Sequence, residues 1–320
     1  MAMEDALERL KVSDLAYIRL QAPDLDQQEA FLADFGLERA ERTADALYMR
    51  GSDATPFLHI THRGAPRFLA TGWYAPNDDA LKAAAALPTA QGIETIDEPG
   101  GGRRVRLTDP WGFGVEIVHG QKAPPARLVE ETLLNFGWDG LRRAGKLQRF
   151  EARPARVKRI AHYVLTTPDI PKGIAWHREM LGLVCSDDVY SGDPTNIVGS
   201  FNRCDRGVEY VDHHVFFCRG GKVAGLNHVS FEVQDFDDVM LGNEYLTKKG
   251  HRHMWGIGRH LLGSQIFDYW CDPYGRVHEH WTDSDRLNNA EPPRLWAREE
   301  AYRAQWGPSA PAEFHGYATP

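Results

Sequence analysis

Apolar and polar residues follow two different periods in the second half of the chain. Residues 160–167 and 226–233 have the composition and patterning of half-buried strands. Residues 170–181, after the first of these segments, carry apolar side chains at helical spacing. A second helix follows residue 233, because Asp235 is a suitable N-cap and Gly250 stands where the helix would end. The pattern therefore predicts two successive strand–helix units.

Two further strands complete the second unit. Residues 265–271 and 276–281 read as strands, and the Asp-Pro-Tyr-Gly sequence between them is typical of a tight turn. Each half of the chain contains two cycles of a strand, a helix and further strands. The sequence therefore predicts an α+β fold built from four βαβββ modules.

The ends of the two halves repeat one motif. Asp109 opens an Asp-Pro-Trp-Gly sequence and Asp272 opens an Asp-Pro-Tyr-Gly sequence. A glutamate follows each aspartate by seven residues, as Glu116 in the first half and Glu279 in the second. Self-similarity of this kind indicates repeated structural units. We interpret it as a duplication.

The starts of the halves match as well, since Tyr17 and His162 stand equally far ahead of a Pro-Asp pair. We predict one domain over 1–120 and a second over 156–285. Residues 121–155 are expected to form a linker followed by a helix. The tail, 286–320, is rich in Pro, Trp, Arg and Glu, which suits a segment packed over a surface, and it could form a lid.

Three residues of the second half occupy positions that the repeat makes equivalent. If paired modules curl into an open barrel, His162, His228 and Glu279 face one cavity from three different strands. Two imidazoles and one carboxylate on one face of an octahedron are typical of non-haem Fe(II) oxygenases, because three adjacent coordination positions stay open. A chelating diol would take two of them and oxygen the third. The sequence predicts a metal site here.

The first half cannot form the same site. Tyr17 stands in place of the first histidine and residues 67–74 contain no histidine, although Glu116 remains. We expect the chemistry only in the second half, with the first half as a structural partner.

Each predicted ligand also has an ordinary structural explanation. A single histidine in a strand is more often a hydrogen-bonded core or surface residue, and Glu279 could simply face water. The chain has fourteen histidines, so a histidine can fall at such a position by chance. The metal interpretation is favoured because all three residues fall at repeat-equivalent positions.

The segment from Gly258 to Glu279 resembles the signature of type I extradiol ring-cleavage dioxygenases, in the vicinal oxygen chelate superfamily. Gly258-Arg259-His260 is followed after seven residues by Asp268-Tyr269, after two more by Asp272-Pro273-Tyr274-Gly275, and after three more by Glu279. The resemblance spans roughly residues 14–285. It implies four modules paired into two open barrel-like domains, the glyoxalase/bleomycin-resistance/extradiol dioxygenase fold, and the same three metal ligands. Asp268 departs from the family, which is usually apolar there, and we expect it to alter the pocket wall without touching a metal ligand.

The resemblance also implies catalytic residues. A catalytic histidine should stand about fifteen residues before His228, and His213 fits that spacing as the acid–base group. Its neighbour His214 is the alternative, because only one of two successive strand residues can face the metal. His260 and Tyr269 match the histidine and tyrosine of the signature. They are expected to hydrogen-bond a diol oxygen.

The function implied is extradiol (meta) cleavage of a catechol-type aromatic diol, as in aromatic hydrocarbon catabolism, with O2 as co-substrate and Fe(II) as the metal. Mn(II) stays open, because the same ligands bind both metals. The alternatives are a glyoxalase-like isomerase or lyase, and a non-catalytic protein that binds aromatic molecules. The sequence leaves open which catechol is cleaved and at which bond. A homo-oligomer is plausible by resemblance.

Composition excludes several other classes. The formal charge of −8 argues against nucleic acid as a partner, since a phosphate-binding surface needs a basic excess. No window approaches the ~18 uninterrupted apolar residues of a membrane span, and the first residues do not form a secretion signal. We expect a cytoplasmic protein. The four scattered cysteines suggest neither a zinc site nor a disulfide framework.

Overall fold

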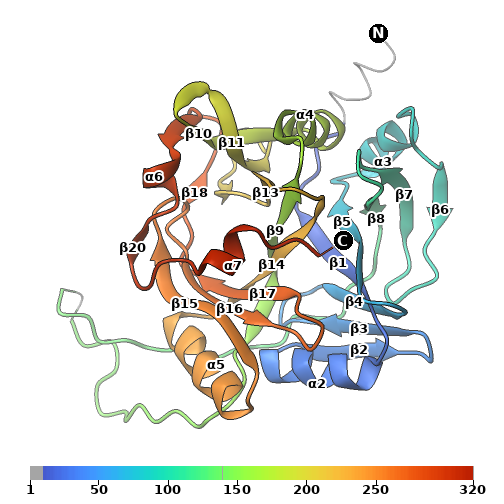
Figure 1. The fold of residues 1–320 in the computed structure, drawn as a ribbon. Helices are drawn as coiled ribbons and strands as arrows, with labels where there is room; N and C mark the ends of the chain where they lie inside the picture. Colours follow the sequence, from blue (N-terminus) through green and yellow to red (C-terminus); the bar gives the residue numbers. More distant parts are fainter. Residues whose placement is uncertain (1–9, 139, 320) are drawn as a thin grey trace.

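The computed structural model describes residues 10–138 and 140–319. Two large sheets dominate it, an eight-stranded sheet in the first half and a ten-stranded sheet in the second (Figure 1). Among the described residues, no helix is long and apolar enough to cross a membrane. The four cysteines are free.

The first sheet consists of two βαβββ modules. The first module contains β1 (Leu15–Ala22), α2 (Leu25–Phe35), β2 (Glu38–Arg42), β3 (Ala46–Arg50) and β4 (His59–Arg63). The second contains β5 (Arg67–Tyr74), α3 (Asp78–Ala85), β6 (Ile93–Thr95), β7 (Arg103–Thr108) and β8 (Gly114–His119). The strand order is β2-β3-β4-β1-β5-β8-β7-β6, so the modules meet along the antiparallel pair β1–β5.

The second sheet repeats this arrangement. Its first module contains β9 (Val157–Thr167), α4 (Ile170–Leu181), β10 (Leu183–Ser191), β11 (Asp193–Cys204), the short β12 (Val211–Asp212) and β13 (Phe216–Gly220). Its second contains β14 (Gly225–Val233), α5 (Phe236–Lys248), β15 (Arg252–His260), β16 (Ile266–Cys271) and β17 (Val277–Thr282). The modules meet along β9–β14. The predicted α+β fold of four modules is confirmed.

The two helices predicted in this half begin and end as expected. Asp235 is the N-cap of α5 and accepts a 3.0 Å hydrogen bond from a backbone N–H of the first turn. Gly182 ends α4 with a left-handed φ of 67°, and Gly250 has a φ of 79° just after α5. Local sequence therefore fixes where these helices stop.

The repeated Asp-Pro-aromatic-Gly motif forms the same turn in both halves. The Oδ1 atoms of Asp109 and Asp272 each accept two backbone N–H bonds of 2.9 Å from their own turn. Gly112 and Gly275 adopt left-handed φ values of 92° and 82° there. In the second half this turn sets the register of β16 against β17.

The segment 121–155 differs from its prediction. Its described residues contain no helix, and Figure 1 shows a long light-green loop. The prediction of a helix was wrong because most helical stability comes from packing an apolar face, and these apolar side chains have no surface to pack on. Leu128 is 95% exposed and Leu147 is 80% exposed.

The tail packs along the second sheet. Its strands β18 (Arg286–Leu287), β19 (Arg294–Ala297) and β20 (Ala304–Trp306) pair with β12, β10 and β15 respectively. Two short helices, α6 (Arg298–Ala301) and α7 (Ala312–His315), complete it. Thr319 then bridges to Leu226 of β14. The tail therefore reaches the strands that carry the predicted metal ligands.

A buried arginine links the two halves close to the predicted site. The Arg276 guanidinium donates to Asp272 Oδ2 at 2.7 Å and to Gln28 Oε1 of α2 at 2.8 Å. It anchors the turn before β17 on the first half. The first half thus supports the strand that carries Glu279.

Candidate metal centre

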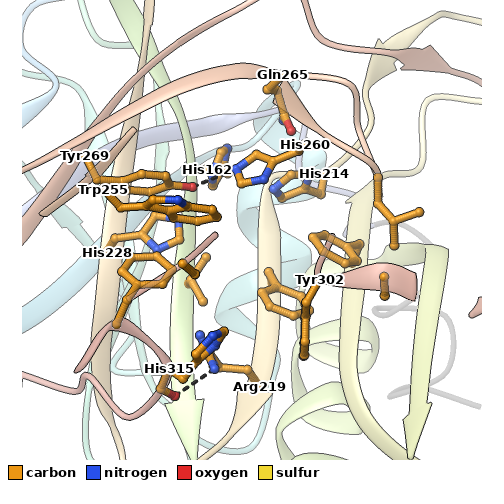
Figure 2. A pocket seen from close by; sticks show the side chains of 17 residues that line it. His162, His214, Arg219, His228, Trp255, His260, Gln265, Tyr269, Tyr302 and His315 are labelled. Atoms are coloured by element: carbon orange, nitrogen blue, oxygen red, sulfur yellow. Dashed lines mark hydrogen bonds between the residues drawn. The ribbon is translucent and has the colours of Figure 1, made fainter. Parts of the chain in front are cut away.

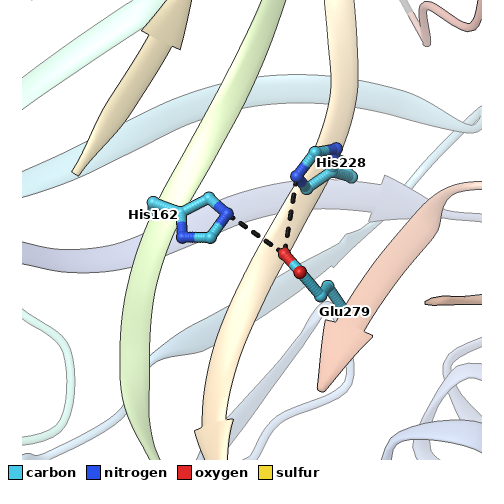
Figure 3. A group of neighbouring side chains, drawn as sticks. All are labelled: His162, His228 and Glu279. Carbon is cyan, nitrogen blue, oxygen red and sulfur yellow. Dashed lines mark ion pairs between the residues drawn. The ribbon is translucent and has the colours of Figure 1, made fainter. Parts of the chain in front are cut away.

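Three neighbouring strands bring the predicted ligands together. His162 lies on β9, His228 on β14 and Glu279 on β17, and all three side chains are buried (Figure 3). Glu279 Oε2 is 3.1 Å from His162 Nε2 and 3.5 Å from His228 Nε2. The candidate ligand atoms all lie within 4.8 Å of one another. Ser230 pairs with both His162 and Glu279, so sheet register produces this convergence.

The protonation states suit a divalent cation. Burial raises the pKa of Glu279, but the neighbouring imidazoles of His162, His260 and His228 lower it further, so the net pKa lies well below the usual value. Burial lowers the pKa of His228 well below its usual value, against the attraction of Glu279. His228 Nδ1 is 2.7 Å from Asn227 Oδ1, which can only accept. The proton is therefore on Nδ1 and the Nε2 lone pair is free.

The donor set also passes a test of fit. Both carboxylate oxygens of Glu279 and Nδ1 of His162 are buried without a hydrogen-bond partner in the described structure. A buried ionised carboxylate without compensation is costly, and a cation bound between these residues would remove that cost. The residues present therefore fit a divalent metal.

A cavity opens next to these ligands. It is mostly apolar, and the tail supplies part of its wall (Figure 2). Its lining side chains are His162, Val164, Phe201, His214, Phe217, Arg219, His228, Trp255, His260, Leu262, Gln265, Tyr269, Ala301, Tyr302, Ala310, Phe314 and His315. Such a lining suits an aromatic guest, because rings pack and stack against it.

The choice between the two adjacent histidines is corrected. His214 lines the cavity, and its ring centroid is 4.2 Å from that of His162. His213 does not line it and instead lies 2.6 Å from Asp187, through Nε2. Only the orientation distinguishes these neighbours, because both are buried. The spacing of fifteen residues selected the wrong one, since His214 is the residue that faces the ligands.

A hydrogen-bonded chain orients His214. Asp187 Oδ2 accepts a hydrogen bond from His213 Nε2–H at 2.6 Å, which leaves Nδ1 of a neutral His213 ring as an acceptor. That atom is 3.0 Å from Nδ1 of His214, which must therefore donate. The lone pair of His214 is then on Nε2. Burial and the neighbouring imidazoles of His162 and His213 lower the pKa of His214 well below its usual value, so the ring is neutral.

His260 and Tyr269 both line the cavity, as expected from the signature. Their Nε2 and hydroxyl oxygen are 2.9 Å apart, and His260 Nε2 is 3.7 Å from Glu279 Oε1. Burial and the nearby Glu279 raise the pKa of Tyr269 well above its usual value, so it keeps its proton. The Tyr269 ring stacks on Trp255 at 5.2 Å.

Asp268 does not shape the cavity, contrary to expectation. Successive strand residues face opposite sides, so Asp268 points away from Tyr269. Its carboxylate is buried and accepts bonds from Asn243, His253 and Trp270. Its role is to satisfy polar groups on the other face of β16.

The first half has no such centre. Register places Tyr17, Gly72 and Glu116 where the second half has His162, Ser230 and Glu279. Glu116 Oε2 accepts from Tyr17 Oη at 2.5 Å and from Arg19 Nη2 at 2.9 Å. Among the residues described, the one cluster of metal-ligating side chains is that of the second half.

Comparison with known proteins gives the same assignment. No family model matches the chain. The chain is 29% identical to metapyrocatechase 2 of Cupriavidus necator, over 97% of its own length and 93% of that protein. It is 23% identical to an iron-dependent extradiol dioxygenase of Rhodococcus jostii, over 93% of its length and 97% of that protein. The chain is related to the extradiol dioxygenases. The resemblance seen in the sequence is confirmed.

Solved structures share the fold of this chain. Homoprotocatechuate 2,3-dioxygenase of Brevibacterium fuscum superimposes with a TM-score of 0.80 at 19% identity, over 97% of this chain and 93% of that one. A Mn(II)-bound glyoxalase of Novosphingobium aromaticivorans superimposes with a TM-score of 0.77 at 24% identity, over 97% of both chains. The fold thus occurs with more than one chemistry, and the site must decide between them.

Some cavity residues had no signal in the sequence. Arg219 lies in a strand with apolar neighbours and belongs to no motif. Tyr302 and His315 come from the tail, whose path over the site follows from tertiary pairing. Only the spatial arrangement identifies these residues.

Proposed function

We propose that this chain cleaves a catechol-type aromatic diol beside its two hydroxyls, with O2 as co-substrate, at a mononuclear Fe(II) centre held by His162, His228 and Glu279. The observation that supports this most strongly is the convergence of two imidazoles and one unpaired buried carboxylate beside an aromatic-lined cavity. When bound, the metal would supply adjacent coordination positions at which diol and oxygen meet. Fe(II) rather than Mn(II) is part of the proposal, supported by the iron-dependent relative.

His214 is the acid–base group in this proposal. Its neutral Nε2 accepts a proton from one diol hydroxyl and later returns it to the product. The hydrogen bond from its Nδ1 to His213, and from His213 to Asp187, holds the ring in the required tautomer and stabilises the imidazolium that forms. His213 is therefore a positioning residue.

Tyr269 and His260 orient the diol. Their mutual hydrogen bond lies beside Glu279, so either group can turn to a substrate oxygen without leaving the cavity. Phe201 and Trp255 hold the ring and exclude water.

A single experiment tests the reaction. Metal-free protein is loaded anaerobically with Fe(II), its iron content is measured, and it is mixed with a panel of catechols and ¹⁸O₂. We expect a yellow ring-opened product that carries two ¹⁸O atoms. Absence of product from every catechol, with one iron bound per chain, refutes the proposal. The isomerase or lyase alternative predicts turnover without oxygen uptake. A location in the cytoplasm and a homo-oligomeric state stay predictions.

A further inference from the structure

One cation in the cavity has no anionic partner. Arg219 of β13 is 8% exposed and lines the same cavity as the candidate ligands. Its Nη2 donates to the backbone oxygen of His315 at 2.7 Å, and its Nε is buried without a partner. Within residues 10–138 and 140–319, no carboxylate lies within 4.0 Å of the guanidinium. The charge therefore faces the cavity uncompensated.

Other buried arginines of this chain are compensated. Arg276 forms an ion pair with Asp272 at 2.6 Å, and Arg19 forms one with Glu116 at 2.9 Å. Arg203 has no carboxylate partner in the described part of the chain, but it donates to four oxygens. Arg219 has one acceptor, a carbonyl. Burial lowers the pKa of Arg219, yet a guanidinium stays protonated in proteins. A buried cation without an anionic partner destabilises the fold, and an anionic ligand would remove that cost.

The position of Arg219 indicates how a ligand would lie. Figure 2 shows Arg219 and His315 at one end of the cavity, and His162, His214 and His260 at the other. Trp255 and Tyr302 lie between these ends. Arg219, Tyr302 and His315 also line a second, outer pocket, together with the exposed Arg298. The Arg298 charge in that pocket is exposed, unlike the buried charge of Arg219.

We propose that the substrate is a carboxylated catechol, whose carboxylate binds the Arg219 guanidinium while its two hydroxyls face the metal ligands. The carboxylate is then on the side of the ring away from the diol. This inference rests on the proposed function. A guanidinium suits a carboxylate because it donates two parallel N–H bonds in one plane. The substrate would supply the acceptors that Arg219 lacks.

Matched acids and esters test the charge alone. The probes are 3,4-dihydroxybenzoate and 3-(3,4-dihydroxyphenyl)propanoate, each beside its methyl ester, which has a similar shape without the charge. Binding to metal-free protein is measured by calorimetry, and turnover of the Fe(II)-loaded protein is measured in parallel. We expect the wild type to favour at least one acid over its ester by about 10- to 100-fold, the range of a charged hydrogen-bonded pair.

Variants then assign the preference to one side chain. Arg219→Gln should bring the acid-to-ester ratio close to 1 while ester binding stays, which also shows that the variant is folded. Arg219→Lys should keep part of the ratio, because it retains the charge without the planar fork. Arg298→Gln removes the same charge from an exposed position, and its ratio should change by no more than about twofold at physiological salt.

The outcomes are decisive in both directions. Equal affinity of the wild type for acid and ester overturns the inference, as does an unchanged ratio in Arg219→Gln. If Arg219→Gln does not fold, the wild-type ratio and its reduction in Arg219→Lys decide. Failure of every catechol to be cleaved refutes the proposed reaction instead, since the calorimetric ratio does not depend on turnover.

Discussion

The two halves of this chain each hold a buried glutamate at the same register position, but different side chains surround it. In the first half, Glu116 contacts Tyr17 and the guanidinium of Arg19. In the second half, Glu279 contacts two imidazoles and has no hydrogen-bond partner among the described residues. One carboxylate is thus neutralised by the protein itself, while the other, without a hydrogen-bond partner in the described part of the chain, is available to the proposed cation.

Few substitutions separate the two arrangements. Strand register places Ala70 where the second half has His228, and Phe57 packs on Tyr17 at 5.2 Å as His214 packs on His162 at 4.2 Å. Gly72 is required beside Tyr17, because a Cβ there would lie 2.4 Å from the tyrosine ring. The same backbone therefore supports a salt-bridged core or a metal site, and side chains decide which.

The largest effect should follow from giving the second half the first half's residue at a ligand position. His228→Ala copies Ala70 and removes one imidazole from the centre. We expect loss of stoichiometric iron and more than a 100-fold loss of activity, since even outer partners of a metal site commonly cost 10- to 100-fold. Elemental analysis and oxygen uptake measure this. Glu116→Gln, the control in the first half, should retain both iron and activity. Full iron occupancy in His228→Ala would contradict the assignment.

The next effect concerns His214, the proposed acid–base group. His214→Phe copies Phe57 and should lower kcat by about 10²- to 10⁴-fold with iron still bound, because proton transfer typically contributes that much. His213→Phe should lower kcat less, by roughly 10- to 100-fold, as expected of a positioning residue. Steady-state kinetics at matched iron content compares the two. A greater loss in His213→Phe than in His214→Phe would return the role to His213.

A third change removes Arg19, the cation that pairs with Glu116 in the first half. Arg19→Met removes the nearest guanidinium from buried Glu116, which keeps longer contacts to Arg104 at 3.5 Å and Arg106 at 3.4 Å. The change should cost up to about 3 kcal/mol of unfolding free energy. The double variant Arg19→Met/Glu116→Gln should lose less, because the buried carboxylate charge is removed as well. Urea unfolding at pH 7 measures both. Equal losses in the single and double variants would mean that Arg19 acts through packing.

The smallest effect is a difference in pH dependence between the halves. Burial lowers the pKa of His177 on α4 to about 4, whereas the equivalent position of α2 holds Leu32. Because the unfolded chain binds this proton near pH 6.5 and the folded chain only near pH 4, stability falls as pH drops through that window. His177→Leu should make the decline shallower by up to about 1.4 kcal/mol per pH unit. Urea unfolding between pH 4.5 and 7 tests the slope, and parallel profiles would contradict it.

The convergence of the three candidate metal ligands could be predicted from sequence because it follows from repetition and register. His162 and Glu279 recur at fixed distances from the Pro-Asp and Asp-Pro motifs, and strand pairing carries those distances into space. The caps of α4 and α5 were predictable for a similar reason, since Gly182 and Asp235 act within one turn.

Other features depended on contacts that local sequence does not encode. His213 and His214 lie in a bend before β13, so the alternation of a strand could not say which one faces the ligands. The helix expected within 121–155 lacked a surface to cover it. Arg219 is identified by what surrounds it, a carbonyl from the tail and no carboxylate among the described residues. These are properties of packing rather than of spacing.

The tail contributes side chains to the cavity wall but none to the cluster of His162, His228 and Glu279. On the proposed function, changes in Tyr302, Phe314 or their neighbours can therefore alter which guest molecule is accepted and leave the three candidate ligands undisturbed. Such a division would let selection diversify the accepted guest in one segment while the candidate ligands in the sheet stay unchanged.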